Sequence, residues 1–257
     1  MKILVFVKLV PDSAATLSVK DGKPHWGDAP LVINPWDEYA VEAALSLAEL
    51  HGGDVIAVSL GDESSKEALK HALAMGCSDA VLISDPALAG SDSGAAAQVM
   101  AAAIKKAGGV DLAVFGKQAI DSDTGIVPAM VARTLGWPAL SLVAAVKGLE
   151  SGKITVERSM EEGRQVVEGP LPAVLSIVKD FGEPRYPSFM GIRKASKAEI
   201  STWDLAELGI DAPSSHVAWT DLIAPPAREV TNEIIEGGSP EEIAGKLADK
   251  IIAEGVL

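Results

Sequence analysis

The feature of this sequence that most constrains its fold is a series of short, continuous apolar runs in the first half of the chain. The runs are aliphatic or β-branched, and polar residues do not alternate with apolar ones. This is the pattern of strands buried on both faces of a parallel sheet. The runs that we interpret as strands are Ile3–Val7, Val55–Leu60, Ala80–Ile83 and Leu112–Phe115.

Longer stretches with helical spacing lie between these runs. Glycines follow the first three of these stretches at Gly52-Gly53, Gly76 and Gly108-Gly109, as is typical of helix ends. The alternation of strands and helices predicts an α/β fold with a doubly wound, mostly parallel sheet of the Rossmann-like type. The predicted helices are Asp37–Leu50, Ser64–Met75, Gly94–Ala107 and a segment from about Thr124 to Leu135.

The pattern changes after Trp137-Pro138. Apolar segments joined by short turns follow, and we expect them to extend or flank the sheet in antiparallel fashion. These segments are Leu140–Val146, Ile154–Ser159, Gln165–Glu168 and Ala173–Val178. From Pro184 onward the chain is expected to be irregular and rich in loops.

A last amphipathic helix is predicted over Ser239–Glu254, because a serine cap, a proline and two acids open it. Ala224-Pro225-Pro226 precedes it as a linker, so we divide the chain into an α/β domain over 1–223 and a linker with a docking helix over 224–257. The apolar stripe of the helix is expected to dock on a partner chain or, alternatively, back on its own domain. The stripe consists of Ile243, Leu247, Ile251 and Ile252.

Composition excludes several classes of partner. The formal net charge is −14, which disfavours nucleic acids and anionic membrane surfaces and is interpreted as a solubility feature. Cys77 is the only cysteine, so there is no internal disulfide and no thiolate cluster, and we expect a buried structural thiol. No apolar run reaches the ~20 residues of a bilayer span, and the amino-terminal run is interpreted as a core strand. We therefore expect a cytoplasmic protein without membrane insertion.

The segment Lys117–Pro128 is the first candidate for binding chemistry. It follows a predicted strand and leads into a helix, at the edge of a parallel sheet where ligands bind. The helix start offers N–H groups to a phosphate and Thr124 adds a hydroxyl, while Asp121 and Asp123 suit ribose hydroxyls or a helix cap. A capped loop without a ligand remains the alternative, since the segment contains no glycine-rich fingerprint.

Two further loops are expected at the same edge. Asn34-Pro35-Trp36-Asp37-Glu38 opens a helix, with Asp37 as a plausible cap and Trp36 placed to cover an adenine ring or to fill the core. Ser59-Leu60-Gly61-Asp62 follows the second strand. With the end of the first strand around Phe6, these loops would converge, and convergence favours a nucleotide site more than any single loop does.

No catalytic residue is predicted. The four histidines (His25, His51, His71 and His216) are scattered, without metal-ligand spacing, and there is no Gly-x-Ser-x-Gly elbow or phosphate-binding P-loop. The acids Glu161 and Glu162 lie in a predicted turn between strands. A hydrolase or ligase acting on an adenylate is suggested only by analogy of fold.

Several segments resemble the electron transfer flavoprotein beta family. Val156-x-Arg158-x-x-Glu161-Glu162-Gly163-x-Gln165-x-Val167, followed by Pro172-x-Val174-Leu175-Ser176, is similar to that family's signature. The segments Asn34–Leu45, Ala72–Gly76, Lys117–Asp121 and Glu183–Phe189 are similar as well, so that the likeness covers essentially the whole chain.

The resemblance implies a redox subunit. In this family the beta subunit pairs with a larger alpha subunit that carries most of a flavin adenine dinucleotide (FAD), and the heterodimer accepts electrons from acyl-CoA or other dehydrogenases. Beta also buries an adenine nucleotide of its own. In most members this is AMP with a structural role, and in electron-bifurcating members it is a second FAD that takes hydride from NADH. A stand-alone adenine-nucleotide module without redox partners is the alternative from another class.

The resemblance also implies site residues. Phe189 lies where the family offers an apolar anchor to a dehydrogenase, and Arg158, Glu161 and Glu162 are expected at a partner surface. AMP-binding members have an Asn-Gln-Thr run where this chain has Gly125, Ile126 and Val127, and this departure favours a second FAD. The expected cofactor-binding residues are Phe6, Asn34, Pro35, Trp36, Asp37, Leu60, Gln118, Ala119, Ile120, Asp121, Ser122, Asp123, Thr124, Gly125, Ile126 and Val127.

Overall fold

The computed structural model describes residues 1–224, 226 and 232–255. The chain divides into two compact units, Met1–Leu222 and Ile223–Leu257, and each is described by itself. Pro225, in the linker predicted from the sequence, lies outside the described residues.

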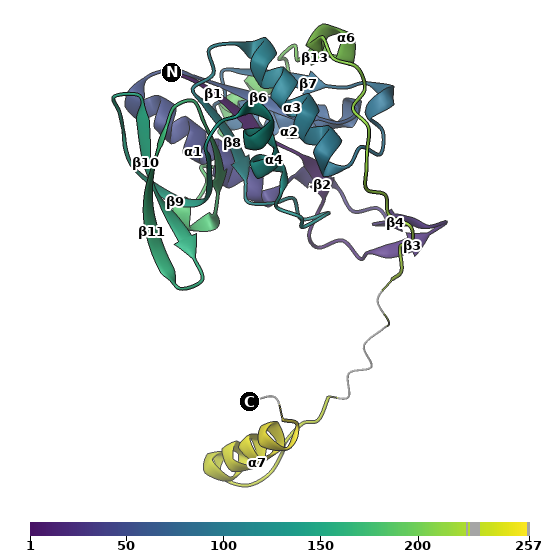
Figure 1. Cartoon of the computed structure of the whole chain (residues 1–257). Coiled ribbons are helices and arrows are strands. Elements are labelled where there is room, and N and C mark those ends of the chain that lie inside the picture. The colour runs from purple at the N-terminus through teal and green to yellow at the C-terminus, as the bar shows by residue number, and fades with distance from the viewer. Residues whose placement is uncertain (225, 227–231, 256–257) are drawn as a thin grey trace. The chain divides into compact units, whose positions relative to one another are not determined.

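A nine-stranded sheet forms the centre of the first unit (Figure 1). Its strand order is β11-β10-β9-β12-β8-β1-β6-β7-β13, and the seven strands from β9 to β13 run parallel to one another. The predicted α/β fold with a mostly parallel sheet is confirmed. The bounds of these seven strands, in sheet order, are β9 Ala139–Glu150, β12 Ala173–Ile177, β8 Leu112–Gly116, β1 Lys2–Phe6, β6 Asp54–Leu60, β7 Asp79–Ile83 and β13 Ser201–Trp203.

Helices cover both faces of the sheet. The helices α1 (Pro35–His51) and α2 (Lys66–Met75) pack on one face, where Ile3, Val5 and Leu69 belong to a core cluster. The helices α3 (Ser93–Ala107) and α4 (Val127–Leu135) pack on the other, in a second cluster. Because successive strand residues point to opposite faces, β1 supplies both clusters. Fully buried alanines on α1, α2 and α3 let these helices approach the sheet closely, which explains how the core is filled with few aromatics.

Two sequence predictions about the later strands need correction. The segments Leu140–Val146 and Ala173–Val178 are predicted to extend or flank the sheet in antiparallel fashion, but β9 and β12 run parallel to each other and to β8, and β12 inserts between β8 and β9. Within the nine-stranded sheet, antiparallel pairing is confined to β9 with β10 (Lys153–Met160) and β10 with β11 (Gly163–Pro170). The short connection before β12 suggested a local hairpin, whereas its uninterrupted apolar run Ala173–Ile177 is buried throughout, as a central strand requires.

The region from Pro184 onward was expected to be irregular, and this prediction is wrong for three short elements. These are α5 (Phe189–Ala195), the edge strand β13 and α6 (Leu205–Leu208). Ser188 caps α5, and Asp204 forms a capping box with Glu207 at α6, so local side chains stabilise elements too short for a periodic signal.

Short elements that the sequence did not reveal lie between the main ones. Between β1 and α1 the chain forms two small antiparallel pairs, β2 with β5 and β3 with β4. Three predicted helix starts move by two or three residues, because α1 begins at Pro35, because a 3₁₀ turn precedes α2 and because α4 begins at Val127. The bounds are β2 Leu9–Pro11, β3 Ser18–Lys20, β4 Lys23–His25, β5 Leu31–Ile33, and the 3₁₀ turns Glu63–Ser65, Pro86–Leu88 and Lys179–Phe181.

The second unit contains one helix, α7 (Pro240–Ala253), within its described residues. Ser239 and Glu242 form a capping box at its start, and Lys250 pairs with Glu233 at 2.5 Å. No residue of α7 is buried, and Leu247 and Ile252 are exposed. Among the described residues of the whole chain, no helix has the length and apolarity needed to cross a membrane.

Candidate functional site

The strand order reverses between β1 and β8. From β1 the chain proceeds to β6 and β7 on one side, and it then crosses to β8 and β12 on the other. The pairing of β1 with β8 ends at Val5 and Val114, and beyond this point the rings of Phe6 and Phe115 stack at 4.5 Å between centroids. In open α/β sheets ligands bind in the crevice outside such a reversal, at the carboxyl ends of the strands. We refer to the space beyond the ends of β1 and β8 as the crevice.

Asn34 ties the start of α1 to the loop that follows β8. Its side chain does not cap the helix, and the buried amide instead reaches across the crevice. Nδ2 donates to the Gln118 carbonyl at 2.8 Å, and Oδ1 accepts from the Ile120 N–H at 3.2 Å. Pro35, at the first helical position, leaves α1 one fewer N–H to satisfy. Two of the predicted loops are therefore held together by one side chain.

Asp37 does not cap α1, which corrects the sequence expectation. It lies in the first turn with its carboxyl buried, and Oδ2 accepts from the Lys8 N–H at 2.8 Å. The Gly116 backbone also hydrogen-bonds to this carboxyl. Burial raises the pKa of Asp37 to about 7, while hydrogen bonds from Asn34, Lys8 and Gly116 act in the opposite direction. The carboxyl thus faces the backbone at the ends of β1 and β8 and not the open side of the crevice.

Gly116 is required at the end of β8. A Cβ at this position would lie 2.5 Å from Asp37 Oδ1 and 2.7 Å from the Trp36 backbone, closer than any side chain permits. The first turn of α1 therefore packs directly on the end of β8. Neither Lys8 nor Gly116 was singled out from the sequence, because their roles depend on contacts across long stretches of chain.

The charged residues of the β8–α4 loop are paired within the site. Lys8 Nζ contacts Asp121 Oδ2 at 2.6 Å, the Gln118 amide hydrogen-bonds to Asp123, and Lys117 Nζ lies 5.2 Å from the centre of the Trp36 ring. Exposed ion pairs of this kind contribute little to stability, typically ~0–1 kcal/mol. Their effect here is on the two carboxylates of the loop, because Lys8 neutralises Asp121 and the Gln118 amide hydrogen-bonds to Asp123.

The start of α4 is open to an anion. Ile126 occupies the cap position without a side-chain hydrogen bond, so the N–H groups of Val127 and Ala129 have no capping acceptor, while Pro128 between them has no N–H. Gly125, with φ of 62°, precedes it in the left-handed region that favours glycine. Thr124, Gly125 and Ile126 are exposed. Free N–H groups, a helix dipole and the Thr124 hydroxyl suit the phosphate or pyrophosphate of a nucleotide.

The end of β6 lies beside the end of β1, where Phe6 pairs with Val58. Leu60 is half-buried there, and a Cβ on Gly61 would lie 2.2 Å from Ser65 Oγ, so the turn accepts only glycine without rearrangement. The buried Ser59 hydroxyl has no hydrogen-bond partner among the described residues. Across the described parts of the chain, no group of three or more His, Cys, Asp or Glu side chains could hold a metal ion.

Residues 28–208 match the family model described as "Electron transfer flavoprotein domain". Among curated proteins, the caffeyl-CoA reductase-Etf complex subunit CarD of Acetobacterium woodii is 37% identical over 264 residues, covering 100% of both chains. The electron transfer flavoprotein subunit beta of Megasphaera elsdenii is 35% identical, again with 100% coverage of both. The same subunit of Syntrophomonas wolfei is 36% identical and covers 97% of this chain and 95% of its own. The chain belongs to the electron transfer flavoprotein beta-subunit family.

The family segment that ends in Phe189 is anchored on α1. The Arg185 guanidinium contacts both oxygens of Glu42, at 2.8 and 2.9 Å, and also pairs with Glu49. Gly191 then lets α5 pack on the end of α2, because a Cβ there would lie 2.3 Å from the Ala74 carbonyl. Phe189 itself is 79% exposed. The anchored segment thus presents an apolar side chain to solvent.

The family signature forms the β10–β11 hairpin. Arg158 braces this hairpin, since Nε donates to the Ser141 carbonyl at 2.7 Å and Nη1 to Gln165 Oε1 at 3.1 Å. Glu161 and Glu162 are exposed in the turn between the two strands. The structure therefore gives Arg158 a role inside the sheet and leaves the two acids free to meet another molecule.

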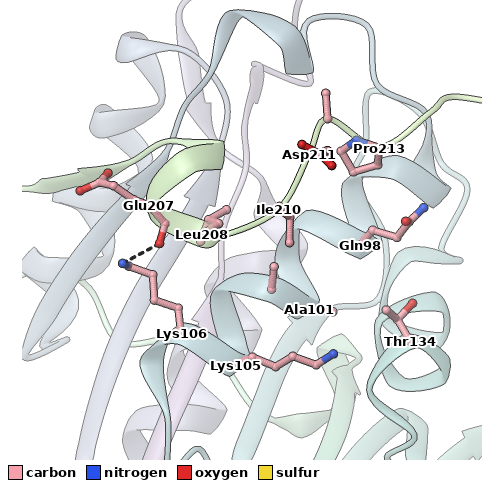
Figure 2. A pocket seen from close by; sticks show the side chains of 13 residues that line it. Gln98, Ala101, Lys105, Lys106, Thr134, Glu207, Leu208, Ile210, Asp211 and Pro213 are labelled. Atoms are coloured by element: carbon pink, nitrogen blue, oxygen red, sulfur yellow. Dashed lines mark hydrogen bonds between the residues drawn. The ribbon is translucent and has the colours of Figure 1, made fainter.

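A hollow among the described residues lies away from the crevice. Figure 2 shows this space of about 820 Å³ between α3, α4 and α6, with Gln98, Thr134 and Asp211 among its lining. Lys106 donates to the Glu207 carbonyl at 2.8 Å and lies over the Trp203 ring. Because α3 runs away from the carboxyl edge of the sheet, its last residues line a hollow toward the opposite edge. This hollow is not part of the site that the family segments form.

Proposed function

We propose that this chain is the beta subunit of a heterodimeric electron transfer flavoprotein and that it holds an adenine nucleotide in the crevice between β1 and β8. The observation that carries the proposal is the joining of three separate chain segments around that crevice by Asn34, Asp37 and Lys8. The adenosine would lie against the Asn34–Asp37 turn and the end of β6. The phosphates would lie at the start of α4.

We propose further that the nucleotide is a second FAD, as in electron-bifurcating members of the family. Gly125-Ile126-Val127 offers backbone N–H groups where polar side chains would favour a single phosphate, and the uncapped start of α4 accepts a larger anion. The relative CarD, whose name places it in a caffeyl-CoA reductase-Etf complex, is consistent with this choice. When bound, the flavin would supply the redox chemistry with NADH, and the residues of this chain would position it and exclude water.

The partner surfaces of the proposal lie outside the crevice. The exposed Phe189 would contact a dehydrogenase, of the acyl-CoA or a related class, and Glu161 and Glu162 would meet a partner at the hairpin turn. The apolar stripe of α7 would dock on the alpha subunit, since its members Leu247 and Ile252 are exposed within their own unit. The helix and its linker then form a separate docking domain.

Counting nucleotides in the purified heterodimer tests this function. The chain is co-produced with an electron transfer flavoprotein alpha subunit, and the complex is denatured and its nucleotides are separated and quantified. Two FAD molecules per heterodimer, one of them reduced by NADH, are the expected result. One FAD and one AMP per heterodimer would instead mean that this chain binds a structural AMP and not a second FAD. A chain that binds neither nucleotide nor alpha subunit would contradict the whole assignment.

A further inference from the structure

The end of the β1–β8 pairing leaves a gap that one side chain spans. The last paired residues are Val5 and Val114, whereas β1 continues to pair with β6 as far as Phe6, and β8 continues to pair with β12 as far as Gly116. Beyond Val5 the backbone pairing of the two strands stops, although the rings of Phe6 and Phe115 still stack, and each strand stays paired on its outer side. The crevice begins beyond these unpaired strand ends.

Asp37 bridges this gap. Its carboxyl receives the Lys8 N–H, two residues beyond the end of β1, and hydrogen-bonds to the Gly116 backbone at the end of β8. The carboxyl thus takes the place of a backbone hydrogen bond between the two strands where their pairing has ended. The carboxyl is only 7% exposed, so it forms the floor of the crevice and not its wall.

We infer that Asp37 is a positioning residue that sets the width of the nucleotide site by holding the ends of β1 and β8 at a fixed separation. It acts through the Lys8 and Gly116 backbones and through the Lys8 side chain, which holds Asp121 in the β8–α4 loop at 2.6 Å. This inference rests on the proposed nucleotide site and adds the residue that determines its shape. Two acceptor oxygens are needed for the bridge, and only the ionised carboxyl keeps both as acceptors.

Protonation of Asp37 would convert one acceptor into a donor that faces a backbone N–H. The end of either β1 or β8 would then lose its hydrogen bond to Asp37. The distance between the two strand ends would no longer be fixed, and the nucleotide would bind more weakly. Since burial brings the pKa of Asp37 to about 7, the change falls near neutral pH. The charged groups around this turn of α1 are Lys8 with Asp121, Lys117 above Trp36, and Glu38, whose carboxylate lies 2.9 Å from His71 of α2.

Binding of ADP-ribose to the full-length chain, measured by calorimetry from pH 5.5 to 8.5, tests this role. The pyrophosphate diester of ADP-ribose keeps its charge over this range, whereas a phosphate monoester such as AMP titrates near pH ~6. For the wild-type chain we expect affinity to fall ~10-fold on acidification, the equivalent of one lost hydrogen bond. Asp37→Asn keeps the shape of the side chain but only one acceptor oxygen. We therefore expect this variant to show, at every pH, the weak affinity that the wild-type chain shows at acidic pH.

Glu38→Gln is the matched control, because it alters the neighbouring carboxylate and its histidine partner without touching the bridge. The ADP-ribose affinity of Glu38→Gln should depend on pH in the same way as that of the wild-type chain. If Asp37→Asn does not fold, the pH dependence of the wild-type chain and of Glu38→Gln still tests the inference. Wild-type affinity that is flat or rises on acidification overturns the inference, as does an Asp37→Asn variant with an unchanged profile. If the wild-type chain binds no ADP-ribose at any pH, that result contradicts the proposed nucleotide site itself.

Discussion

The burial of Asp37 predicts an unusual dependence of folding stability on pH. A carboxyl whose pKa is 3.8 in the unfolded chain and about 7 in the folded one binds a proton more tightly when folded. Between these two values the folded state carries the proton that the unfolded state has released, so stability falls as pH rises. The contribution is fully present below about pH 4 and is lost by about pH 7.

The magnitude follows from the same two values. Each pKa unit corresponds to ~1.4 kcal/mol, so the whole change amounts to ~4 kcal/mol, with a slope of at most ~1.4 kcal/mol per pH unit within the window. Ionising Asp37 in the protein interior costs free energy, and its hydrogen bonds offset only part of this cost. Ordinary paired carboxylates have the opposite sign, since their pKa values fall on folding.

Asp37→Asn isolates this contribution. The free energy of unfolding is measured by urea titration at several pH values from 4.5 to 7.5 for both chains, and the difference between them is plotted against pH. Because all other titrating groups are shared, the difference should change by several kcal/mol in favour of the variant as pH rises. Parallel curves for the two chains would refute the reasoning, because they would mean that Asp37 ionises equally easily folded and unfolded.

Three further predictions concern packing, loop order and electron transfer. Gly116→Ala should lower stability by ~3 kcal/mol or more, because the new Cβ would lie 2.5 Å from Asp37 Oδ1, whereas Gly148→Ala, with nothing within 4 Å, should change it little in the same thermal unfolding assay. Asn34→Ala should raise hydrogen exchange in residues 117–126, since the Ile120 N–H loses its acceptor, and unchanged exchange there would contradict the tie between the loops. Phe189→Ala should slow electron transfer from a dehydrogenase several-fold without altering flavin content, and normal transfer rates would exclude it as an anchor.

The parts of the fold that depend on local patterns could be predicted from the sequence. The apolar runs of β1, β6, β7 and β8 gave these strands to within one residue at each end. The position of β12 could not be predicted in this way, because an uninterrupted apolar run shows that a strand is buried but not between which strands it inserts. The helices α5 and α6 are too short for periodicity, and their capping residues were the only local signal.

The candidate site shows the same division between local and long-range information. The sequence placed the Asn34–Asp37 turn and the β8–α4 loop at one edge, since each leads into a helix after a strand that was predicted for the parallel sheet, the first strand for the turn and the fourth for the loop. It could not tell that Asn34 and Asp37, one helical turn apart, bond to different segments. The assignment of Asp37 as a cap was wrong for this reason, because a cap is defined by its own helix whereas Asp37 bonds to the ends of β1 and β8.

The acids of the β8–α4 loop show why electrostatics at such a site follow from the fold and not from the motif. Read along the chain, Asp121 and Asp123 put two negative charges beside the expected phosphate. In the structure Lys8, 113 positions away, neutralises the first, and the Gln118 amide donates to the second. With the Asp121 charge neutralised by Lys8 and Asp123 held by the Gln118 amide, the helix dipole and the free N–H groups at the start of α4 can attract an anion. Replacing Lys8 by methionine should therefore weaken ADP-ribose binding more at low ionic strength than at high, because it leaves Asp121 uncompensated near the anion.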